Sequence, residues 1–559
     1  MSDPIQPLDI QLALALHQKG QWTAARAAYE ALIAQSPQHF DAWHLLGVLE
    51  HQQKNSERAI ALMTHAATLN PAQADVHFNL GVALAQMQQH EAAVERYSQA
   101  ILCQADHAKA WANRGMALFA LGHWHQALES LEGALALQPQ SATTHNNRGS
   151  VLRALGQLEA AIESFDRALA LDPRYADAFM NKGNALKAMG LFTQAIACYD
   201  TAIALNPHLT QAYSNRGVAF KEQLQLPNAI DCYDQALALN PQHIEANWNK
   251  ALDLLLLGDF QQGWPLHEWR WQRAEAKTSR RDFVQPLWLG DAQLAGRTIL
   301  LHAEQGFGDA IQFCRYATEV AQLGAKVILE VSGPLMPLMG SLNGVSQLVE
   351  RGSTLPFFDC HCPLMSLPLA LAHQSVKPFS SYLRPSREVL ERWSQRLSHV
   401  KRPRVGLAWS GNAQHNNDLH RSVSLPALLK SLPDHVQAVS LQKMLRPEDE
   451  TLLQAQREVL HFGAELQNFE ETAALCAQMD LVISVDTSVA HLSGAIGAPT
   501  WVLLPYCPDW RWQLDRADSP WYPSAQLYRQ KRWGDWTDVW GEICRDLHHF
   551  MPLSSEDKR

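Results

Sequence analysis

A 34-residue repeat constrains the first half of this chain more than any other feature. Proline, glycine and alanine each recur on a grid with this period. The prolines are Pro37, Pro71, Pro139, Pro173, Pro207 and Pro241; the glycines are Gly47, Gly81, Gly115, Gly149, Gly183 and Gly217; the alanines are Ala25, Ala59, Ala93, Ala127, Ala161, Ala195 and Ala229. Three registers with one period predict seven copies of a single structural unit between about residues 6 and 243.

The residue types on these grids predict a pair of antiparallel helices in each unit. Small residues suit the point where the helices cross, and larger apolar residues such as Tyr97 and Phe165 fill the space between them. Proline ends the second helix, because it lacks an N–H group and fixes φ. One helix pair cannot bury its apolar face alone, so the units are expected to stack into a superhelix. An eighth unit begins near residue 244 and diverges after Gly258-Asp259-Phe260.

The period and the Gly/Ala/Pro pattern resemble those of the tetratricopeptide repeat. The resemblance implies an all-α tetratricopeptide-repeat superhelix over residues 1–280, with seven repeats and a degenerate eighth.

Asparagine recurs with the same period on the first helix of successive units, at Asn79, Asn113, Asn147, Asn181, Asn215 and Asn249. One interpretation is a groove that grips the backbone of a protein or peptide acceptor, because amide side chains both donate and accept hydrogen bonds. This resembles the superhelix of O-linked N-acetylglucosamine transferase, where such asparagines line the inner groove. The alternative is that these amides support packing between repeats.

From about residue 283 the period disappears, and short β-branched runs alternate with helical stretches. Strands are expected at 298–302, 326–331, 346–349, 357–361, 404–409, 436–441, 481–485 and 500–504, and a helix at 309–322. The alternation predicts two Rossmann-like domains with parallel sheets, at 281–385 and 386–559. Ligands of such sheets bind at the carboxyl ends of the strands.

The first strand is followed by a glycine-containing turn and Asp309. Asp309 is either the cap of the next helix or a general base that points into a cleft.

The loop after the strand at 481–485 opens a helix with Asp486, Thr487, Ser488, Val489 and His491. Backbone N–H groups and small hydroxyls at a helix N-terminus can bind a diphosphate. The alternative is a capping Asp-Thr-Ser sequence with a buried histidine.

A third loop, Trp409-Ser410-Gly411-Asn412, leads to Arg421 and Ser422. Arg421 is either a partner for a leaving phosphate or a solvent-facing arginine. Gln442 and Lys443 follow the strand at 436–441 and are also placed at the cleft.

Together these loops resemble glycosyltransferase family 9, which contains the ADP-heptose–lipopolysaccharide heptosyltransferases. The resemblance rests on Gln305-Gly306-Phe307-Gly308-Asp309, on Ser410-Gly411-Asn412 with Arg421-Ser422, and on Asp486 to His491, and covers roughly residues 295–545. It implies a GT-B fold, Asp309 as the catalytic base and Asp486 to His491 as the donor diphosphate loop. Gly308, Ser410, Gly411, Arg421, Gln442 and Lys443 complete the expected donor site. The Ser488-Val489-Ala490 sequence stands where heptosyltransferases carry Gly-Leu-Ser, so the resemblance names neither heptose as donor nor lipopolysaccharide as acceptor.

The leading hypothesis is therefore a glycosyltransferase, hexosyl- or heptosyltransferase-like, that moves a sugar from a nucleotide-diphosphate donor with inversion. The acceptor is a protein or peptide recruited by the repeats, or a glycan. No cofactor and no metal are expected, because no Asp-x-Asp motif occurs and Cys360-His361-Cys362 alternates across a strand. One alternative is a protein-binding scaffold with a catalytically silent nucleotide-sugar domain, and another is a repeat adaptor with a structural α/β half.

Composition narrows the partners and the compartment. The net charge of −10 argues against a nucleic-acid binder, and the sequence has no apolar run of ~18 residues that would span a membrane. Nine scattered cysteines and the start Met1-Ser2-Asp3-Pro4 predict a cytoplasmic protein without disulfides or a signal peptide.

Tryptophan is concentrated after residue 248. We expect Trp264, Trp269, Trp271 and Trp288 to anchor the repeats on the first α/β domain, and Trp510, Trp512 and Trp521 to lie near the cleft or the domain seam. Apolar residues at 536, 540, 543 and 547 predict a terminal amphipathic helix that can cross back to the first α/β domain.

Overall fold

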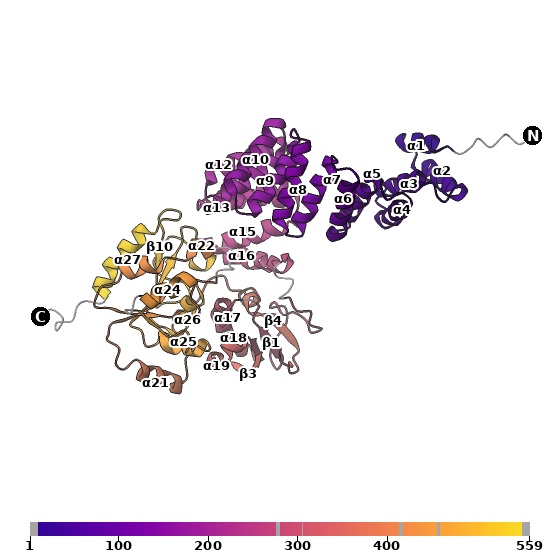
Figure 1. The fold of residues 1–559 in the computed structure, drawn as a ribbon. Coiled ribbons are helices and arrows are strands. Elements are labelled where there is room, and N and C mark those ends of the chain that lie inside the picture. Colours follow the sequence, from indigo (N-terminus) through magenta and orange to yellow (C-terminus); the bar gives the residue numbers. More distant parts are fainter. Residues whose placement is uncertain (1–8, 275–279, 305, 413–417, 456–458, 551–559) are drawn as a thin grey trace, which may run out of the picture. The chain divides into compact units, whose positions relative to one another are not determined.

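The computed structural model describes residues 9–274, 280–304, 306–412, 418–455 and 459–550. Its contacts divide the chain into a first unit, Met1–Arg216, and a second unit, Gly217–Arg559, and each is described by itself (Figure 1). Among the described residues, no helix is both long and apolar enough to cross a membrane.

The first unit is a stack of antiparallel helix pairs. Its helices are α1 (Ile10–Gln18), α2 (Trp22–Gln35), α3 (Phe40–Gln52), α4 (Ser56–Leu69), α5 (Ala74–Gln86), α6 (His90–Cys103), α7 (Ala108–Ala120), α8 (Trp124–Leu137), α9 (Ala142–Ala154), α10 (Leu158–Leu171), α11 (Ala176–Ala188), α12 (Phe192–Leu205) and the start of α13 (Thr210–Glu222). The grid glycines lie where the two helices of a pair meet. A Cβ added at Gly149 would come within 2.6 Å of the Phe165 ring, and one at Gly183 within 2.7 Å of the Tyr199 ring. The predicted crossing of helices over small residues is confirmed.

The second unit begins with the last repeat helices and continues into two parallel sheets. The repeat helices are α14 (Leu226–Leu239), α15 (Ile244–Leu257) and α16 (Phe260–His267), followed by the short 3-10 helix η1 (Glu268–Gln272). The described helices of the chain therefore form seven pairs and an eighth, α15–α16.

The first sheet has the strand order β3-β2-β1-β4, and the second has β10-β9-β8-β5-β6-β7, with parallel pairing in both. The strands are β1 (Thr298–His302), β2 (Lys326–Val331), β3 (Val345–Glu350), β4 (Cys360–Pro363), β5 (Arg404–Ala408), β6 (Gln437–Ser440), β7 (Val459–His461), β8 (Leu481–Val485), β9 (Thr500–Leu504) and β10 (Ala525–Arg529). In both sheets the first strand in sequence is central and the order reverses beside it. Crevices at such switch points are where doubly wound sheets bind ligands.

Helices and 3-10 turns connect these strands. They are α17 (Phe307–Phe313), η3 (Cys314–Tyr316), α18 (Ala317–Gln322), η4 (Gly333–Leu335), α19 (Met336–Met339), η5 (Leu364–Ser366), α20 (Leu367–Ala370), α21 (Arg387–Arg396), α22 (Asp418–Arg421), α23 (Leu425–Lys430), α24 (Pro447–Ala455), α25 (Phe469–Cys476), α26 (Ser488–Ile496), η6 (Trp510–Trp512) and α27 (Thr537–Phe550).

Strands lie at seven of the eight predicted ranges, and the eighth, expected at 357–361, begins three residues later as β4; β7 and β10 are additional. Both additional strands lie at the edges of the second sheet. The helix expected at 309–322 begins earlier, at Phe307, and a 3-10 turn interrupts it at Cys314–Tyr316.

One hydrophobic core joins the last repeat helices to both sheets. It contains Trp264 of α16, Leu301 of β1 and Leu504 of β9. Trp264 meets Trp510 edge to face, with ring centroids 5.4 Å apart. Trp264 and Trp288 are buried, as expected for anchors, whereas Trp269 and Trp271 are half-buried.

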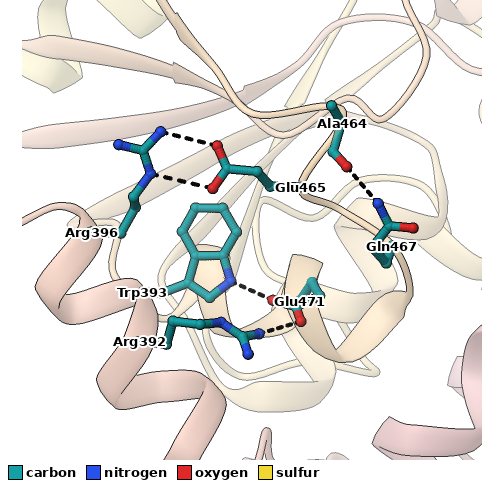
Figure 2. A pocket seen from close by; sticks show the side chains of 7 residues that line it. All are labelled: Arg392, Trp393, Arg396, Ala464, Glu465, Gln467 and Glu471. Carbon is teal, nitrogen blue, oxygen red and sulfur yellow. Dashed lines mark hydrogen bonds and ion pairs between the residues drawn. The ribbon is translucent and has the colours of Figure 1, made fainter.

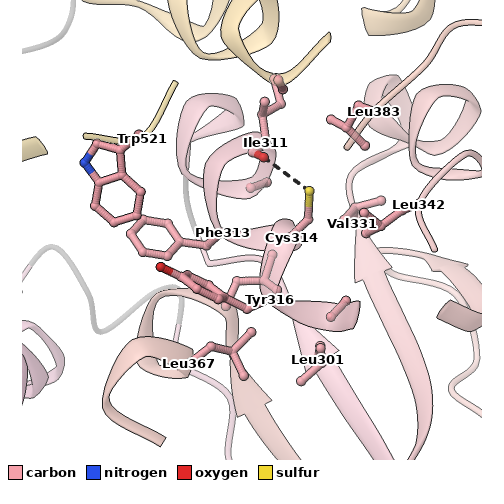
Figure 3. Packing of buried hydrophobic residues seen from close by; sticks show 14 of the residues in the cluster. Leu301, Ile311, Phe313, Cys314, Tyr316, Val331, Leu342, Leu367, Leu383 and Trp521 are labelled. Atoms are coloured by element: carbon pink, nitrogen blue, oxygen red, sulfur yellow. Dashed lines mark hydrogen bonds between the residues drawn. The ribbon is translucent and has the colours of Figure 1, made fainter. Parts of the chain in front are cut away.

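The sequence had suggested that the terminal helix crosses back to the first sheet. In the described residues, a different segment does so. The apolar stripe of α27, with Ile543 and Leu547, packs on the second sheet beside Leu407. The crossing is made by residues 510–522, whose Trp521 packs against Phe313 with centroids 5.9 Å apart (Figure 3). Large flat indole rings, more than the narrow stripe of α27, supply the apolar area that this junction buries.

Candidate functional site

The loop after β1 brings Asp309 to the carboxyl end of the first sheet. Gly306 has φ +73°, a conformation that favours glycine, and directly precedes α17. Asp309 is the third residue of α17 and not its cap, so the capping interpretation is wrong. Its carboxylate Oδ1 accepts a hydrogen bond from Arg511 Nη2 at 2.6 Å. Gln305, part of the motif noted above, lies outside the described residues.

Arg511 belongs to η6, on the segment after β9, and ties the two sheets together. Its Nε donates to Gln312 Oε1 at 2.7 Å, and its Nη1 donates to Asp509 Oδ1 at 2.8 Å. The guanidinium also lies over the Trp510 ring, 4.4 Å from the centroid. Arg511 is only 8% exposed, so its contacts are shielded from water.

The loop after β8 brings α26 against α17, so the two predicted loops meet. The close approach depends on Gly308, because a Cβ there would come within 3.0 Å of His491 Cδ2 and 3.6 Å of Ser488 Cα. Gly308 therefore sets the spacing of the two helices.

The start of α26 carries no side-chain cap among the described residues. Thr487 occupies the N-cap position, but its hydroxyl lies 3.2 Å from Ser484 Oγ and makes no capping bond. The predicted side-chain cap of this loop is wrong, whereas the buried histidine of the same alternative is present as His491. The N–H groups of the first turn remain available for an anion.

Burial controls the charges of His491 and Asp486. His491 Nδ1 lies 3.0 Å from the Tyr522 hydroxyl, and its ring stacks on Trp512. Burial lowers the pKa of His491 to about 3, so the imidazole is neutral at pH 7. Burial also raises the pKa of Asp486 to about 6 and that of Asp309 to about 6, partly opposed at Asp309 by Arg511.

Arg421 reaches the same site from α22. Its Nη1 donates to the main-chain oxygen of Asp486 at 3.0 Å. Gly411 makes room for it, because a Cβ there would lie 2.3 Å from Arg421 Nη2. Residues 413–417, between these two, lie outside the described residues.

Gln442 and Lys443 each bond to a neighbouring loop, and their part in donor binding stays a prediction. Gln442 Oε1 accepts hydrogen bonds from the backbone N–H groups of Trp409 and Ser410 at 2.9 and 2.8 Å, so it holds the Ser410 loop in place. Lys443 Nζ donates to the Gln467 carbonyl at 3.3 Å. The long, exposed lysine side chain finds its partner on the neighbouring loop before α25.

A cavity of about 420 Å³ lies on the second sheet's domain and contains none of the predicted site residues (Figure 2). Its lining is Arg392, Trp393, Arg396, Ala464, Glu465, Gln467 and Glu471. Arg396 bonds Glu465 at 3.1 Å, and Trp393 Nε1 donates to Glu471 at 2.8 Å. Arg392 also pairs with Glu471, so the charged groups of the lining bond to one another.

The asparagine grid forms bonds between successive repeats. Asn181 donates to Asn146 at 2.9 Å, Asn215 donates to Asn184 at 2.9 Å, and Asn79 lies 3.0 Å from His44 Nε2. All six grid asparagines, including Asn113, Asn147 and Asn249, are half-buried. The bonds favour the packing interpretation for Asn79, Asn181 and Asn215, and the partial exposure leaves peptide binding as a prediction for the set.

A second ladder, of ion pairs, was not predicted. A basic residue on a first helix pairs with an acidic residue on the preceding second helix, 16 positions earlier. Arg148 pairs with Glu132 at 3.1 Å, Lys182 with Asp166 at 2.6 Å, and Arg216 with Asp200 at 2.6 Å. The 34-residue spacing of these charges is visible in the sequence and could have revealed the ladder.

The site also contains residues that the sequence reasoning missed, chiefly Asp509, Arg511 and Tyr522. The signal for the first two was Asp509-Trp510-Arg511-Trp512, a charged pair among tryptophans just after a buried strand. Within the described part of the chain, no three His, Cys, Asp or Glu side chains gather as metal ligands would. His361 instead pairs with His302, with Nδ1 and Nε2 3.1 Å apart.

One curated protein to which the chain is similar is Protein FlbA of Caulobacter vibrioides (strain ATCC 19089 / CIP 103742 / CB 15), 24% identical over 330 residues. The match covers 54% of this chain, and the chain spans about half the length of FlbA.

Solved structures to which part of the chain is similar include the APC/C hetero-tetramer Cut9–Hcn1, with a TM-score of 0.38 and 20% identity over 45% of this chain and 50% of that one. Another is YrrB, described as a TPR protein with an unusual peptide-binding site, with a TM-score of 0.28 and 23% identity over 33% of this chain and 95% of that one.

The family described as tetratricopeptide repeat matches residues 10–74, 78–123, 108–141, 176–209 and 210–243, and a further TPR repeat matches 149–190. The matches coincide with the helix pairs and with the glycine contacts described above. The N-terminal part of this chain, through residue 243, is an array of tetratricopeptide repeats.

Proposed function

We propose that the second unit is an inverting, metal-independent glycosyltransferase of GT-B type, and that the repeats recruit its acceptor. The observation that carries the proposal is the meeting of α17 and α26, about 180 residues apart in sequence. Asp309 and Asp486 follow the central strand of one sheet and a switch-point strand of the other. Doubly wound folds bind ligands at the carboxyl ends of their strands, and these edges of both sheets therefore meet at one site.

In the proposed reaction, an acceptor hydroxyl attacks the anomeric carbon of the donor sugar. Asp309 takes the hydroxyl proton, the new glycosidic bond forms, and the bond to the phosphate oxygen breaks, so the nucleoside diphosphate leaves with its electron pair. Burial suits Asp309 to this role, since a pKa of about 6 leaves it largely ionised at pH 7 but more basic than an ordinary carboxylate.

The leaving diphosphate would be stabilised by the first turn of α26 and by Arg421. The uncapped N–H groups of Ser488 and Val489 lie at the positive end of the helix dipole. The Arg421 guanidinium is held against the main chain of Asp486 at the same point. His491 and Tyr522 brace this turn from the interior.

The acceptor is proposed to be a protein or peptide. Tetratricopeptide repeats favour protein binding, and the half-buried asparagine grid offers amides along successive repeats.

A second candidate is a protein-binding scaffold whose nucleotide-sugar site is silent. The observation that favours it is the ion pair of Asp309 with Arg511, which occupies one oxygen of the proposed base. The two candidates share the donor site and differ only in turnover.

The test is a panel of ADP-, UDP- and GDP-sugars added to the full chain, with melting temperature and donor turnover as readouts. A donor that binds the native site raises the melting temperature. Arg421→Gln should reduce this shift, whereas Arg387→Gln, which removes an exposed arginine that pairs with Glu391, should leave it unchanged. A shift with turnover supports the enzyme, a shift without turnover supports the silent scaffold, and no shift with any donor refutes both.

A further inference from the structure

We propose that Arg511 is the positioning residue for Asp309: it fixes one carboxylate oxygen and leaves the other to receive the acceptor proton. The inference deepens the proposed function and rests on it. It assigns a role to a residue outside every motif that the sequence analysis singled out.

The geometry of Arg511 is fully determined by its partners. Each of its three nitrogen atoms donates to a different residue: Gln312 at 2.7 Å, Asp509 at 2.8 Å and Asp309 at 2.6 Å. The backbone supports the same arrangement, because Arg511 N donates to Asp509 Oδ1 at 3.0 Å. A guanidinium held at all three nitrogens cannot rotate to follow a mobile carboxylate, so the carboxylate must adopt the position that Arg511 offers.

Asp309 has no other side-chain donor among the described residues. Oδ1 is bound to Arg511, and Oδ2 lies against Gly306, where a Cβ would come within 2.8 Å. The Asp309 side chain is 30% exposed, whereas the Arg511 side chain is 10% exposed. The exposed group is therefore the carboxylate, and the buried group is the residue that orients it.

The charges around Asp309 oppose one another. Arg511 and Arg270 lower its pKa, while burial, Asp509 and Glu304 raise it. Removing Arg511 should therefore make Asp309 harder to ionise, and removing the charge of Asp509 should make it easier. The two substitutions, two positions apart, should shift the pKa of Asp309 in opposite directions. A general loss of packing would not produce opposite shifts.

The first measurement needs no donor. The melting temperature of each variant is compared with that of the same variant carrying Asp309→Asn, from pH 4 to pH 8. Because the native pKa of Asp309, about 6, exceeds its ordinary value of 3.8, the native state binds the proton more tightly than the unfolded state. The stability contributed by Asp309 is thus greatest below pH 4 and declines as the pH rises to about 6.

In Arg511→Gln the stability contributed by Asp309 should continue to decline to a pH roughly 1–3 units higher than in the wild type. Arg511→Lys should give a smaller upward change, and Asp509→Asn should move the decline downward. Arg516→Gln, which removes an arginine of the same segment that pairs with Asp518, should not move it. An unchanged decline in Arg511→Gln and Arg511→Lys would overturn the proposal.

The second measurement uses the donor identified above. Arg511→Lys should lower kcat about tenfold or more with KM nearly unchanged, because the base is misplaced while the donor site is intact. A raised KM with unchanged kcat would show that Arg511 binds donor instead. Failure of the proposed function itself would be seen separately, in wild-type protein that turns over no donor while the pH measurement still responds to Arg511.

Discussion

The repeats and the two-sheet region, which comprises η1 and the residues after it, differ in whether their stabilising contacts recur. In the repeats one contact recurs: a glycine faces a ring at Gly149–Phe165 and again at Gly183–Tyr199. In the two-sheet region each decisive contact occurs once, such as Arg511 with Asp309, 202 residues apart. In the repeats, many equivalent contacts each contribute a similar share of the stability. In the two-sheet region, a contact that occurs once can place a charged group at one site.

The charges show the same difference. In the repeats, ion pairs lie at the surface, with about half of each acidic side chain exposed. In the two-sheet region, Arg270 and Glu304 form a bidentate pair at 2.8 and 2.7 Å and are both buried. Arg270 also bonds Ser366, so it connects the 3-10 helix η1, which follows the last repeat helix, to the turn η5 after β4 of the first sheet.

The buried pair gives the largest expected effect. Arg270→Met leaves the carboxylates of Glu304 and Glu268 without a cation. It should lower the free energy of unfolding by about 3–5 kcal/mol. The double variant Arg270→Met/Glu304→Met should recover part of this loss, because the more deeply buried carboxylate is then also gone and only Glu268, with its side chain 19% exposed, lacks a cation. Urea unfolding followed by circular dichroism measures both. A double variant as unstable as the single one would contradict the unique-contact account.

The repeated contact should give equal effects at equivalent positions. Phe165→Ala and Tyr199→Ala each empty the space beside a grid glycine, and each should cost roughly 3–4 kcal/mol. Hydrogen exchange should locate the loosening in the altered repeat and its neighbours. Loosening that spreads across the whole chain would show that the repeats do not act as separate units.

The pH dependence of His302 sharpens the comparison. Burial lowers its pKa to about 3, below the unfolded value of 6.5, so its contribution to stability is present above pH 6.5 and is lost as the pH falls. His302→Gln should remove this loss, worth about 1–3 kcal/mol between pH 6.5 and 4. The difference in melting temperature between wild type and variant measures it, and a constant difference across this range would disprove the assignment.

The smallest effect is expected on the ladder of ion pairs. Lys182→Ala should cost only about 0.2–1 kcal/mol, because Asp166 is half exposed and water screens the pair. The cost should fall further in 1 M salt. A cost of several kcal/mol would mean that this ladder, and not the glycine contacts, holds the repeats together.

The same contrast explains what the sequence could predict. The helix pairs were predictable because every register repeats, and β1, β8 and β9 because each is a buried apolar run. The edge strand β7 has three residues and offers too short a pattern.

Within the site, the loops were predictable from strand ends, but the partners were not. Asp309, Asp486 and Arg421 follow or approach buried strands, whereas Arg511 depends on how residues 510–522 fold back to the first sheet. Gln442 and Lys443 are adjacent in sequence, yet one holds the Ser410 loop and the other bonds Gln467. Tertiary contacts decided both roles.

The most direct test of the proposed function is turnover by the full chain with the donor that raises its melting temperature and a candidate acceptor protein. Mass spectrometry would detect the transferred sugar, and the released nucleoside diphosphate would be quantified beside it. Wild-type protein should transfer the sugar, and Asp309→Asn should still bind the donor but transfer it about 100-fold more slowly or less. Equal transfer by Asp309→Asn, or donor binding by wild type without any transfer, would contradict the account.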